Sequence, residues 1–219
     1  MLKFLIKSFK WTAIRLFFLT AMLALLIWSI TFHPPALQAE VVVNQAAVAT
    51  LKSGQQVKIL SWNVQYMSGK NYEFWYDSIN GDGPDIRAKR TDIEQTFKHV
   101  AQLIIEQNPD VILLQELHDN AKRTDYEDQL QRLLALLPAE YNNYSEAFYW
   151  QASYVPLPQI MGSVGMKLGV ISKYKLGDAL RHQLPSIKAD IITDQFNFRR
   201  AIQEISLPVT GGSKLTLMN

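Results

Sequence analysis

The sequence predicts an α/β fold preceded by an N-terminal membrane helix, and three patterns support this class. Two apolar segments, residues 57–64 and 111–116, flank one amphipathic helical segment, which is the arrangement of two parallel strands joined by a crossover helix. Short alternating segments follow from about residue 145, so we expect a mixed sheet with flanking helices. A long apolar run without charges near the N-terminus predicts the membrane helix.

The composition allows one folded domain and excludes several chemistries. The 219 residues are 48% hydrophobic, which is too apolar for a wholly disordered chain, and one domain usually takes roughly 100–200 residues. The sequence has no cysteine, which excludes disulfides, thiolate metal sites and cysteine nucleophiles. Four of the 22 basic and one of the 20 acidic side chains lie in residues 1–40. Residues 41–219 therefore carry a net charge of −1 and show no overall attraction for nucleic acid.

Residues 1–33 are expected to be a signal anchor or a signal peptide. The densest apolar run, Leu16–Phe32, has 17 residues. This length is at the boundary between a signal-peptide core of about 7–15 residues and a membrane span of about 17–25. Four basic residues precede the run and none follows shortly after it, which places the N-terminus in the cytoplasm. The domain is then extracytoplasmic, either membrane-anchored or exported; a poor cleavage site at residues 37–39 favours the anchor.

The folded domain is expected at residues 56–219, after a linker at residues 34–55 that shows little periodicity. Residues 57–64 are rich in β-branched and large apolar side chains and predict the first strand. A helix is expected from about residue 85 until Asn108-Pro109-Asp110 ends it. Its apolar stripe consists of Ile93, Phe97, Val100, Ala101, Ile104 and Ile105.

The second strand, residues 111–116, is continuously apolar until its end, which is typical of a strand covered on both faces. Asn63 and Glu116 each lie at the carboxyl end of a strand, 53 positions apart in the sequence. Because parallel strands end at the same edge of a sheet, we expect the Asn63 amide and the Glu116 carboxylate to be neighbours at a ligand-binding edge.

The rest of the chain predicts one more helix and several strands. The helix is expected at about residues 121–137. Candidate strands are Ser145–Trp150, Lys167–Ser172, Asp178–His182, Ala201–Leu207 and Lys214–Met218, and Gly211-Gly212 is a candidate hairpin turn.

Several of these segments together resemble the endonuclease/exonuclease/phosphatase family, which includes DNase I-like nucleases, exonuclease III-like repair enzymes and bacterial sphingomyelinases. The similar segments are ILSWNV at 59–64, DVILLQE at 110–116, GVISKYKL at 169–176, RRA at 199–201 and LTLMN at 215–219. Lys175 stands where the family commonly has proline. The resemblance covers about residues 57–219 and corresponds to the N-terminal half of the family.

This resemblance implies a fold and a mechanism. The fold would be the first half of a four-layer α/β sandwich of the DNase I-like type. Its members hydrolyse phosphoesters with Mg²⁺ or Mn²⁺, and by position Asn63 matches the family's first-strand asparagine and Glu116 its metal-binding glutamate. The resemblance therefore assigns both residues as catalytic and as metal ligands, since hard divalent cations prefer such oxygen ligands.

The family's later histidine, D-x-N and S-D-H motifs are not in the sequence, so the resemblance implies a chain truncated on its C-terminal side and inactive as it stands. We also expect the inner face of its sheet to lack a partner, which would leave the domain marginally stable. His118 is expected to be a solvated loop residue, because it matches no family position.

The substrate stays open at this stage between a lipid headgroup and nucleic acid, with a non-catalytic gene remnant as a third possibility. Export and an aromatic-rich loop at residues 65–84 mildly favour a phospholipid or another extracytoplasmic phosphodiester. The same loop could instead stack bases or simply pack on its own sheet. No protein partner is expected; the expected partners are the phosphoester substrate and, through the N-terminal segment, the membrane.

Overall fold

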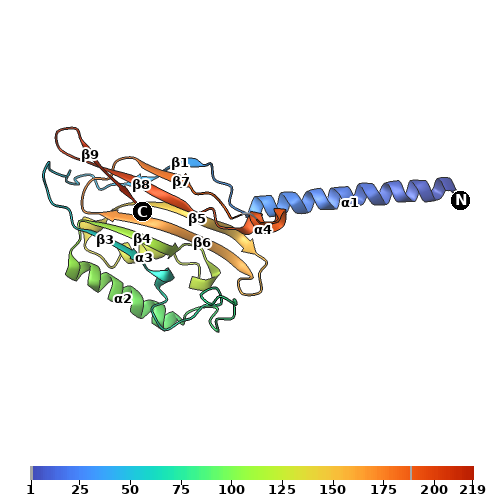
Figure 1. The fold of residues 1–219 in the computed structure, drawn as a ribbon, viewed down its shortest axis with the longest axis horizontal. Helices are drawn as coiled ribbons and strands as arrows, with labels where there is room; N and C mark the ends of the chain where they lie inside the picture. Colours follow the sequence, from blue (N-terminus) through green and yellow to red (C-terminus); the bar gives the residue numbers. More distant parts are fainter. Residues whose placement is uncertain (1, 188) are drawn as a thin grey trace.

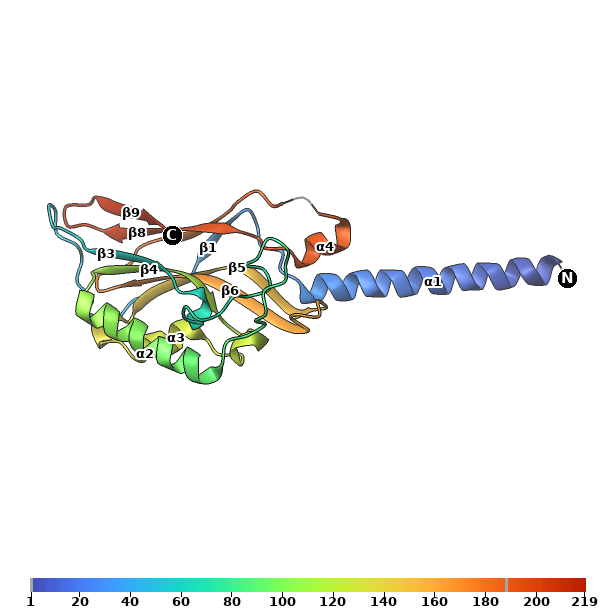
Figure 2. The same ribbon diagram turned by 60° about the horizontal axis from the view of Figure 1, so that its bottom comes forward.

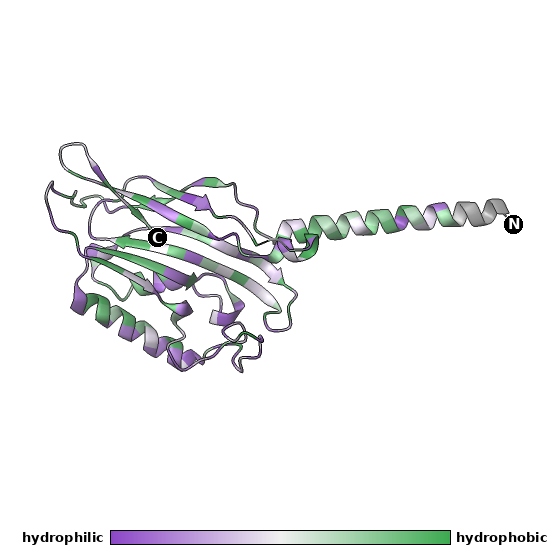
Figure 3. Cartoon of the chain, viewed as in Figure 1, coloured by the Kyte–Doolittle hydropathy of each residue, from purple (hydrophilic) through white to green (hydrophobic). Residues whose placement is uncertain are grey.

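The structure, a computed structural model, describes residues 2–187 and 189–219. Two sheets lie face to face, helices cover the outer face of the larger sheet, and one long helix projects away from them (Figures 1 and 2). This mixed α/β architecture confirms the predicted fold class. Figure 3 shows the part of the projecting helix nearer the domain as mostly hydrophobic.

The helices are α1 (Leu2–Ile30), α2 (Arg90–Gln107), α3 (Gln129–Leu134) and α4 (Ile191–Phe196), with 3-10 turns at Gln65–Met67, Lys122–Thr124 and Ala139–Tyr141. Within the described residues, the larger sheet has five strands in the spatial order β2 (Val42–Val43), β5 (Asn143–Val155), β6 (Gly162–Ser172), β4 (Val111–His118) and β3 (Ile59–Asn63). The smaller sheet has the order β1 (Leu37–Glu40), β7 (Ala179–Gln183), β8 (Ala201–Pro208) and β9 (Lys214–Met218).

β3 and β4 pair in parallel and α2 connects them, as the sequence predicts. The last turn of α2 ends at Asn108, whose left-handed backbone lets its N–H donate to the Ile104 carbonyl at 2.8 Å. The helix begins at Arg90 and not near residue 85, because Asp85 belongs to the preceding loop. The backbone N–H of Asp85 donates to the Glu73 carbonyl at 3.1 Å, and its carboxylate accepts from the Glu73 N–H at 2.9 Å.

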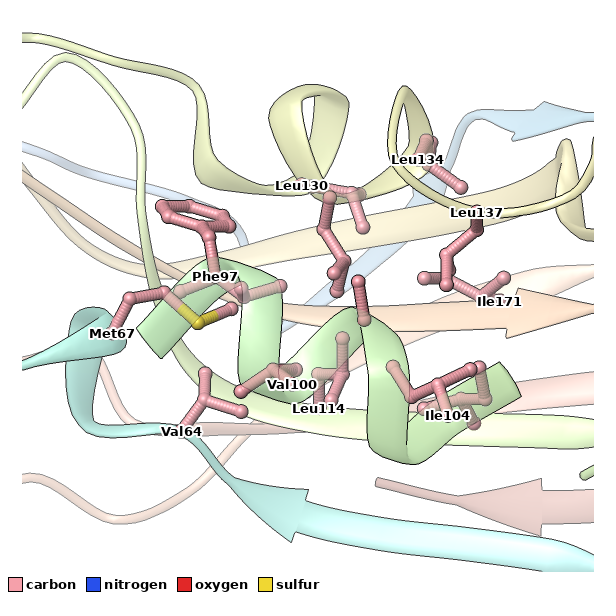
Figure 4. Packing of buried hydrophobic residues seen from close by; sticks show 14 of the residues in the cluster. Val64, Met67, Phe97, Val100, Ile104, Leu114, Leu130, Leu134, Leu137 and Ile171 are labelled. Carbon is pink, nitrogen blue, oxygen red and sulfur yellow. The ribbon is translucent and has the colours of Figure 1, made fainter. Parts of the chain in front are cut away.

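The outer face of the larger sheet buries the apolar stripe of α2 (Figure 4). Phe97 and Ile104 of α2 lie in one buried cluster with Leu114 of β4 and Ile171 of β6. Fully burying each such side chain contributes about 1.5–3 kcal/mol, so this cluster holds α2 on the sheet. The stripe prediction is confirmed except at Ile105, which is exposed.

A second buried cluster lies between the two sheets. Val111 and Leu113 of β4 and Val170 of β6 pack with Ile205 and Leu207 of β8, and each of these five side chains is buried. The expectation that the inner face would lack a partner is therefore wrong. The second sheet is present and covers this face, because the later segments form strands that fold back over β4 and β6.

The expectation that residues 34–55 form a linker is wrong for part of this segment, which is folded. β1 pairs with β7 at the edge of the smaller sheet, and β2 pairs with β5 at the edge of the larger one. Further along, Leu51 is buried in the cluster between the sheets. Short edge strands of two to four residues carry too few alternating positions for a period to be visible in the sequence. Where the domain begins stays a prediction.

The helix expected at residues 121–137 is much shorter in the structure. Only Gln129–Leu134 is α-helical, and Lys122–Thr124 forms a separate 3-10 turn. Between them Asp125 and Tyr126 have left-handed backbones, with φ of 55° and 63°, which no α-helix accommodates. The later strands lie where they were predicted, with β5 and β6 longer than expected.

Within α1, residues Phe9–Ile30 are long and apolar enough to cross a membrane, and they are not buried against the rest of the chain. This fits the expected membrane helix by length and composition. A signal sequence has the same properties, so the helix is weak evidence for an anchor and leaves its orientation a prediction.

Candidate functional site

Asn63 and Glu116 lie at the same edge of the larger sheet. In the parallel ladder Asn63 is level with Gln115, the residue before Glu116. The N–H of Val64 donates to the Gln115 carbonyl at 3.1 Å and extends the pairing past the last residue of β3. The sheet edge expected from the crossover pattern is therefore confirmed; that the two side chains bind one cation stays a prediction.

Glu116 lies at a bulge in β4, where the pairing with β6 shifts register between Leu114 and Leu117. Its backbone is left-handed, with φ of 59°, a conformation that costs of order 1–3 kcal/mol for a residue with a side chain. A bulge re-aims a side chain that would otherwise alternate with its neighbours. The half-buried Glu116 carboxylate forms no hydrogen bond or ion pair with any described residue.

Asn63 is exposed, and its side chain begins the turn that follows β3. Its Oδ1 accepts a hydrogen bond from the Gln65 N–H at 2.9 Å, a local side-chain turn that starts the left-handed run of residues 65–67. Oδ1 keeps one lone pair, and Nδ2 has no hydrogen-bond partner among the described residues. The amide can therefore donate to a phosphate oxygen and still accept weakly from another group.

Two further amides continue the row of polar groups at this edge. The Gln115 side chain donates to Asn219 Oδ1, and Asn219 Nδ2 donates to the carbonyls of Leu114 at 3.0 Å and Gly169 at 3.1 Å. Asn219 follows β9 and thus links the smaller sheet to the larger one beside Glu116. The sequence signal for Gln115 is a polar residue at the end of an otherwise apolar strand.

Arg123, which was not predicted as a site residue, lies among three rings of the aromatic-rich loop at residues 65–84. The Arg123 guanidinium lies 5.5 Å from the ring centre of Tyr66, 5.3 Å from that of Phe74 and 5.2 Å from that of Tyr76. It also donates to the Tyr76 hydroxyl at 2.9 Å. Burial lowers the pKa of Arg123, although the guanidinium stays charged at neutral pH.

Two phenols lie within the field of the Glu116 carboxylate. Burial raises the pKa of Tyr149, and the negative charge of Glu116 raises it further. Burial also raises the pKa of Tyr76, against the opposing effect of Arg123. Both phenols are therefore neutral at physiological pH and can donate hydrogen bonds to an anion.

His118 is not the solvated loop residue that the sequence suggested. It ends β4, is almost fully buried, and stacks on the Tyr66 ring with centroids 4.5 Å apart. Its Nδ1 lies 3.2 Å from the Thr124 hydroxyl, and its backbone N–H donates to the Gln129 side chain at 2.9 Å. Burial, with a smaller effect from Arg123, lowers the pKa of His118 to about 3, so the ring is neutral.

The aromatic-rich loop at residues 65–84 mainly packs on its own sheet. Tyr66 and Phe74 are buried in a cluster with Tyr149, Met166 and Leu168, whereas Tyr76 is partly exposed. This outcome favours the packing interpretation over base stacking for the two buried rings.

A pocket of about 200 Å³ lies next to the end of β4 and is lined by three cations, Arg87, Lys122 and Arg123. Arg87 is paired with Asp125 at 2.9 Å, and Lys122 Nζ donates to the Met161 carbonyl at 2.7 Å. Both contacts leave donor capacity, so the pocket can receive a small anionic group.

The donor set at the edge suits a hard divalent cation only as an open site. Among the residues that the structure describes, no three or more His, Asp or Glu side chains converge as a metal-binding group. Mg²⁺ usually keeps several waters and takes one or two carboxylates together with substrate phosphates. One unpaired carboxylate beside an amide row fits that kind of site and does not fit a closed protein cage.

The two packed sheets with flanking helices define a fold of the phosphoesterase and nuclease type. A sequence model of the endonuclease/exonuclease/phosphatase family matches residues 60–206, and the chain belongs to this family. Its strand-end residues Asn63 and Glu116 lie inside the matched range.

The solved structures similar to this chain include the following two, while no curated protein matches it. One is an endonuclease/exonuclease/phosphatase from Beutenbergia cavernae DSM 12333, with 20% identity, a TM-score of 0.49, and coverage of 74% of this chain and 37% of that one. The other is an endonuclease/exonuclease/phosphatase family protein from Leptotrichia buccalis C-1013-b, with 18% identity, a TM-score of 0.45, and coverage of 75% and 54%. The match thus spans about a third to a half of the length of these proteins.

Proposed function

We propose that this chain carries the metal- and phosphate-binding edge of a divalent-metal-dependent phosphoester hydrolase. The observation that supports this function is the Glu116 carboxylate, which is unpaired, half-buried and held in a strained conformation at the carboxyl end of a parallel strand. Strain of this kind persists where a side chain must point at a ligand. Family membership makes the phosphoester the favoured class of substrate.

Each residue at the edge has a proposed role that follows from its chemistry. Mg²⁺ or Mn²⁺, when bound, polarises a phosphoryl oxygen and stabilises charge on the leaving group. Glu116 is the proposed metal ligand, and Asn63 Nδ2 is the proposed donor to a phosphoryl oxygen. The neutral phenols of Tyr76 and Tyr149 add uncharged donors, and Arg123 adds a fixed positive charge.

Among the described residues no histidine lies free at this edge to activate water, so we propose that the chain binds metal and phosphate without turnover by itself. His118 is buried, His182 pairs with Glu204 at 2.9 Å, His33 stacks on Trp28, and His99 lies on the surface of α2. General acid–base groups typically contribute a factor of about 10²–10⁴ each, so a site without them is slow even when it binds well.

The placement of the edge favours a lipid headgroup as the substrate. Three and four residues after Glu116, Asp119 and Asn120 line a cavity of about 280 Å³ together with residues 29–32 at the end of α1. The carboxyl end of β4 is therefore on the same side of the domain as the proposed membrane anchor. With the domain extracytoplasmic, phosphoesters in the adjacent leaflet lie within reach of the site.

A nuclease is the second candidate, because the family match does not discriminate between phosphoesters. If the gene encodes a longer version of the protein, that version would be assayed with Mg²⁺ on sphingomyelin vesicles and on plasmid DNA. The assay separates the lipid phosphodiesterase from the nuclease. Cleavage of DNA alone would contradict the lipid assignment. No turnover of either substrate would favour the non-catalytic remnant.

Metal binding tests the site directly and does not need turnover. We expect Glu116→Gln to weaken Mn²⁺ binding, followed by electron paramagnetic resonance of free Mn²⁺, by about tenfold or more, which corresponds to about 1.4 kcal/mol. Glu106→Gln is the matched control, since Glu106 is an exposed glutamate in the last turn of α2 and is not part of the sheet edge that carries Glu116. Equal Mn²⁺ affinities in the wild type and the Glu116→Gln variant would refute the assignment.

A further inference from the structure

Exposed apolar side chains gather where α1 meets the domain. In Figures 1 and 2 both α4 and the tip of the β5–β6 hairpin lie beside the C-terminal end of α1. The hairpin contributes Tyr154, Leu157 and Met161, and the segment around α4 contributes Ile187, Ile191 and Ile192. Single exposed apolar residues are ordinary, but six large ones in two neighbouring segments mark an interaction surface.

The isoleucines of α4 are held outward by folded structure. Asp190 caps the helix, and its Oδ1 accepts from the N–H groups of Ile192 and Thr193, each at 3.0 Å. At the other end of α4 the Phe196 carbonyl accepts from the Trp150 indole of β5 at 2.8 Å. With both ends fixed, Ile191 and Ile192 remain 86% and 63% exposed.

α1 is joined to the domain by a stiff connection. Thr31 forms a β-bridge with Ala152 of β5, immediately after the helix ends. His33 stacks on Trp28 with ring centroids 3.6 Å apart and lies 2.9 Å from the Thr31 hydroxyl. The Arg181 guanidinium lies over the neighbouring Phe32 ring at 5.5 Å. The surface around the end of α1 is thus fixed relative to the helix axis.

We propose that Tyr154, Leu157, Met161, Ile187, Ile191 and Ile192 form a lipid-docking rim, which inserts into the interface of the membrane that α1 spans. The inference rests on the anchor part of the proposed function, because a stiff spanning helix brings the surface around its end to the bilayer. Trp28 and Tyr154 suit this position, since aromatic side chains with a polar edge prefer the headgroup region. The rim lies beside the end of α1, where the helix would leave the bilayer, and this continuity favours lipid over a second protein copy.

The sequence has no cysteine, so single-cysteine labelling can test the rim in the full chain. An environment-sensitive fluorophore would be attached to Ile191→Cys, with Ile192→Cys as a second rim position. Leu23→Cys in the middle of α1 reports whether the helix is in the bilayer. Ile105→Cys is the matched control, because it replaces an exposed isoleucine in the last turn of α2, near the opposite ends of the strands.

Each labelled chain would be placed in phosphatidylcholine vesicles and quenched by lipids with shallow or deep spin labels, or by aqueous iodide. We expect the labels at 23, 191 and 192 to be quenched several-fold more by the lipids than the label at 105. A lipid-quenched label at 23 with labels at 191 and 192 that behave like the one at 105 would overturn the rim and leave the anchor standing. If the label at 23 also stays outside the lipid, the anchor and the rim both fail.

A second copy of the chain gives a different result. The labels at 191 and 192 would then be shielded from iodide without lipid quenching, and the shielding would grow with protein density, which would overturn lipid docking. Neither metal nor phosphoester enters the measurement, so its outcome is independent of the hydrolase assignment.

Discussion

Replacement of Lys167 by methionine is the sharpest test of how the sheet edge is held. Lys167 lies in β6 and is fully buried, with 0% of its side chain exposed. Its Nζ contacts three carboxylates, Asp119 at 2.9 Å, Asp128 at 2.9 Å and Glu146 at 2.6 Å. Methionine keeps most of the side-chain volume and removes the charge, so the change isolates the ion cluster from the packing.

The expected loss of stability follows from the geometry. At an effective dielectric constant of about 20, each pair near 2.9 Å gains about 6 kcal/mol of gross attraction, most of which the desolvation of the buried lysine offsets. Removing one partner of a buried ion pair typically costs about 3–5 kcal/mol. The three carboxylates are 26–30% exposed and can regain water. We therefore expect Lys167→Met to lower the free energy of unfolding by about 3 kcal/mol, the low end of that range.

The loss should also depend on pH. Burial raises the pKa of Glu146, and the nearby Lys167 charge partly lowers it again. Without the lysine the pKa of Glu146 rises further, and a carboxyl whose pKa is higher in the folded state destabilises the fold as pH rises past its unfolded pKa. The deficit of the variant should be full at pH 7 and shrink as pH falls toward about 4.5.

Urea unfolding in detergent micelles, followed by near-ultraviolet circular dichroism at both pH values, measures these differences. Arg90→Met is the control, because Arg90 pairs with Glu94 at 3.1 Å with both side chains exposed, and an exposed ion pair contributes little to stability. Equal losses for the two variants, or a Lys167→Met deficit that grows on acidification, would refute this account of the cluster.

Three further predictions concern other parts of the fold. Arg181→Met should lower the free energy of unfolding by about 3 kcal/mol in the same urea assay. The buried guanidinium donates to the carbonyls of Phe148 at 2.7 Å and Arg199 at 2.5 Å, and both carbonyls lose this donor in the variant. A loss under about 1 kcal/mol would contradict the prediction. Gly165→Ala should cost about 3 kcal/mol or more, because its Cβ would lie 1.8 Å from the backbone oxygen of Asp119, and a stable variant with unchanged circular dichroism would show this approach to be wrong. Asp190→Ala should speed amide hydrogen exchange in the first turn of α4, because it removes the helix cap. Hydrogen bonds from the start of the helix lower the pKa of Asp190, so in the wild type the same protection should fade below about pH 4, where the carboxylate is protonated. Unchanged exchange in the variant would exclude the cap.

The part of the site that the sequence predicted is the part fixed by local patterns. An apolar strand, an amphipathic helix and a second apolar strand determine a parallel pair, and that pair alone places Asn63 and Glu116 at one edge. The register, with Asn63 level with Gln115, follows from the ladder. Their role in binding metal and phosphate stays a prediction that the Mn²⁺ experiment tests.

The rest of the site depends on contacts between distant segments, which no local pattern encodes. The helix expected at residues 121–137 is broken by a left-handed turn just after Arg123, and Arg123 contacts rings from residues 66–76. His118 was expected in solvent because it matches no family position, yet β4 continues to it and the Tyr66 ring covers it. Lys167 is the one charged residue of β6, and the three carboxylates that it binds come from three other segments.

These long-range contacts explain how a strained Glu116 persists. Before the bulge, Asn219 hydrogen-bonds to the Leu114 carbonyl and holds β4 to the neighbouring strands. After the bulge, Lys167 binds Asp119, and the Asp119 N–H donates to the Gly165 carbonyl at 3.1 Å. With both flanks fixed, relaxing the left-handed φ of Glu116 would break at least one of these contacts, each of which is comparable in free energy to the strain of about 1–3 kcal/mol. The Lys167 cluster therefore supports the backbone conformation of Glu116 as well as the stability of the fold.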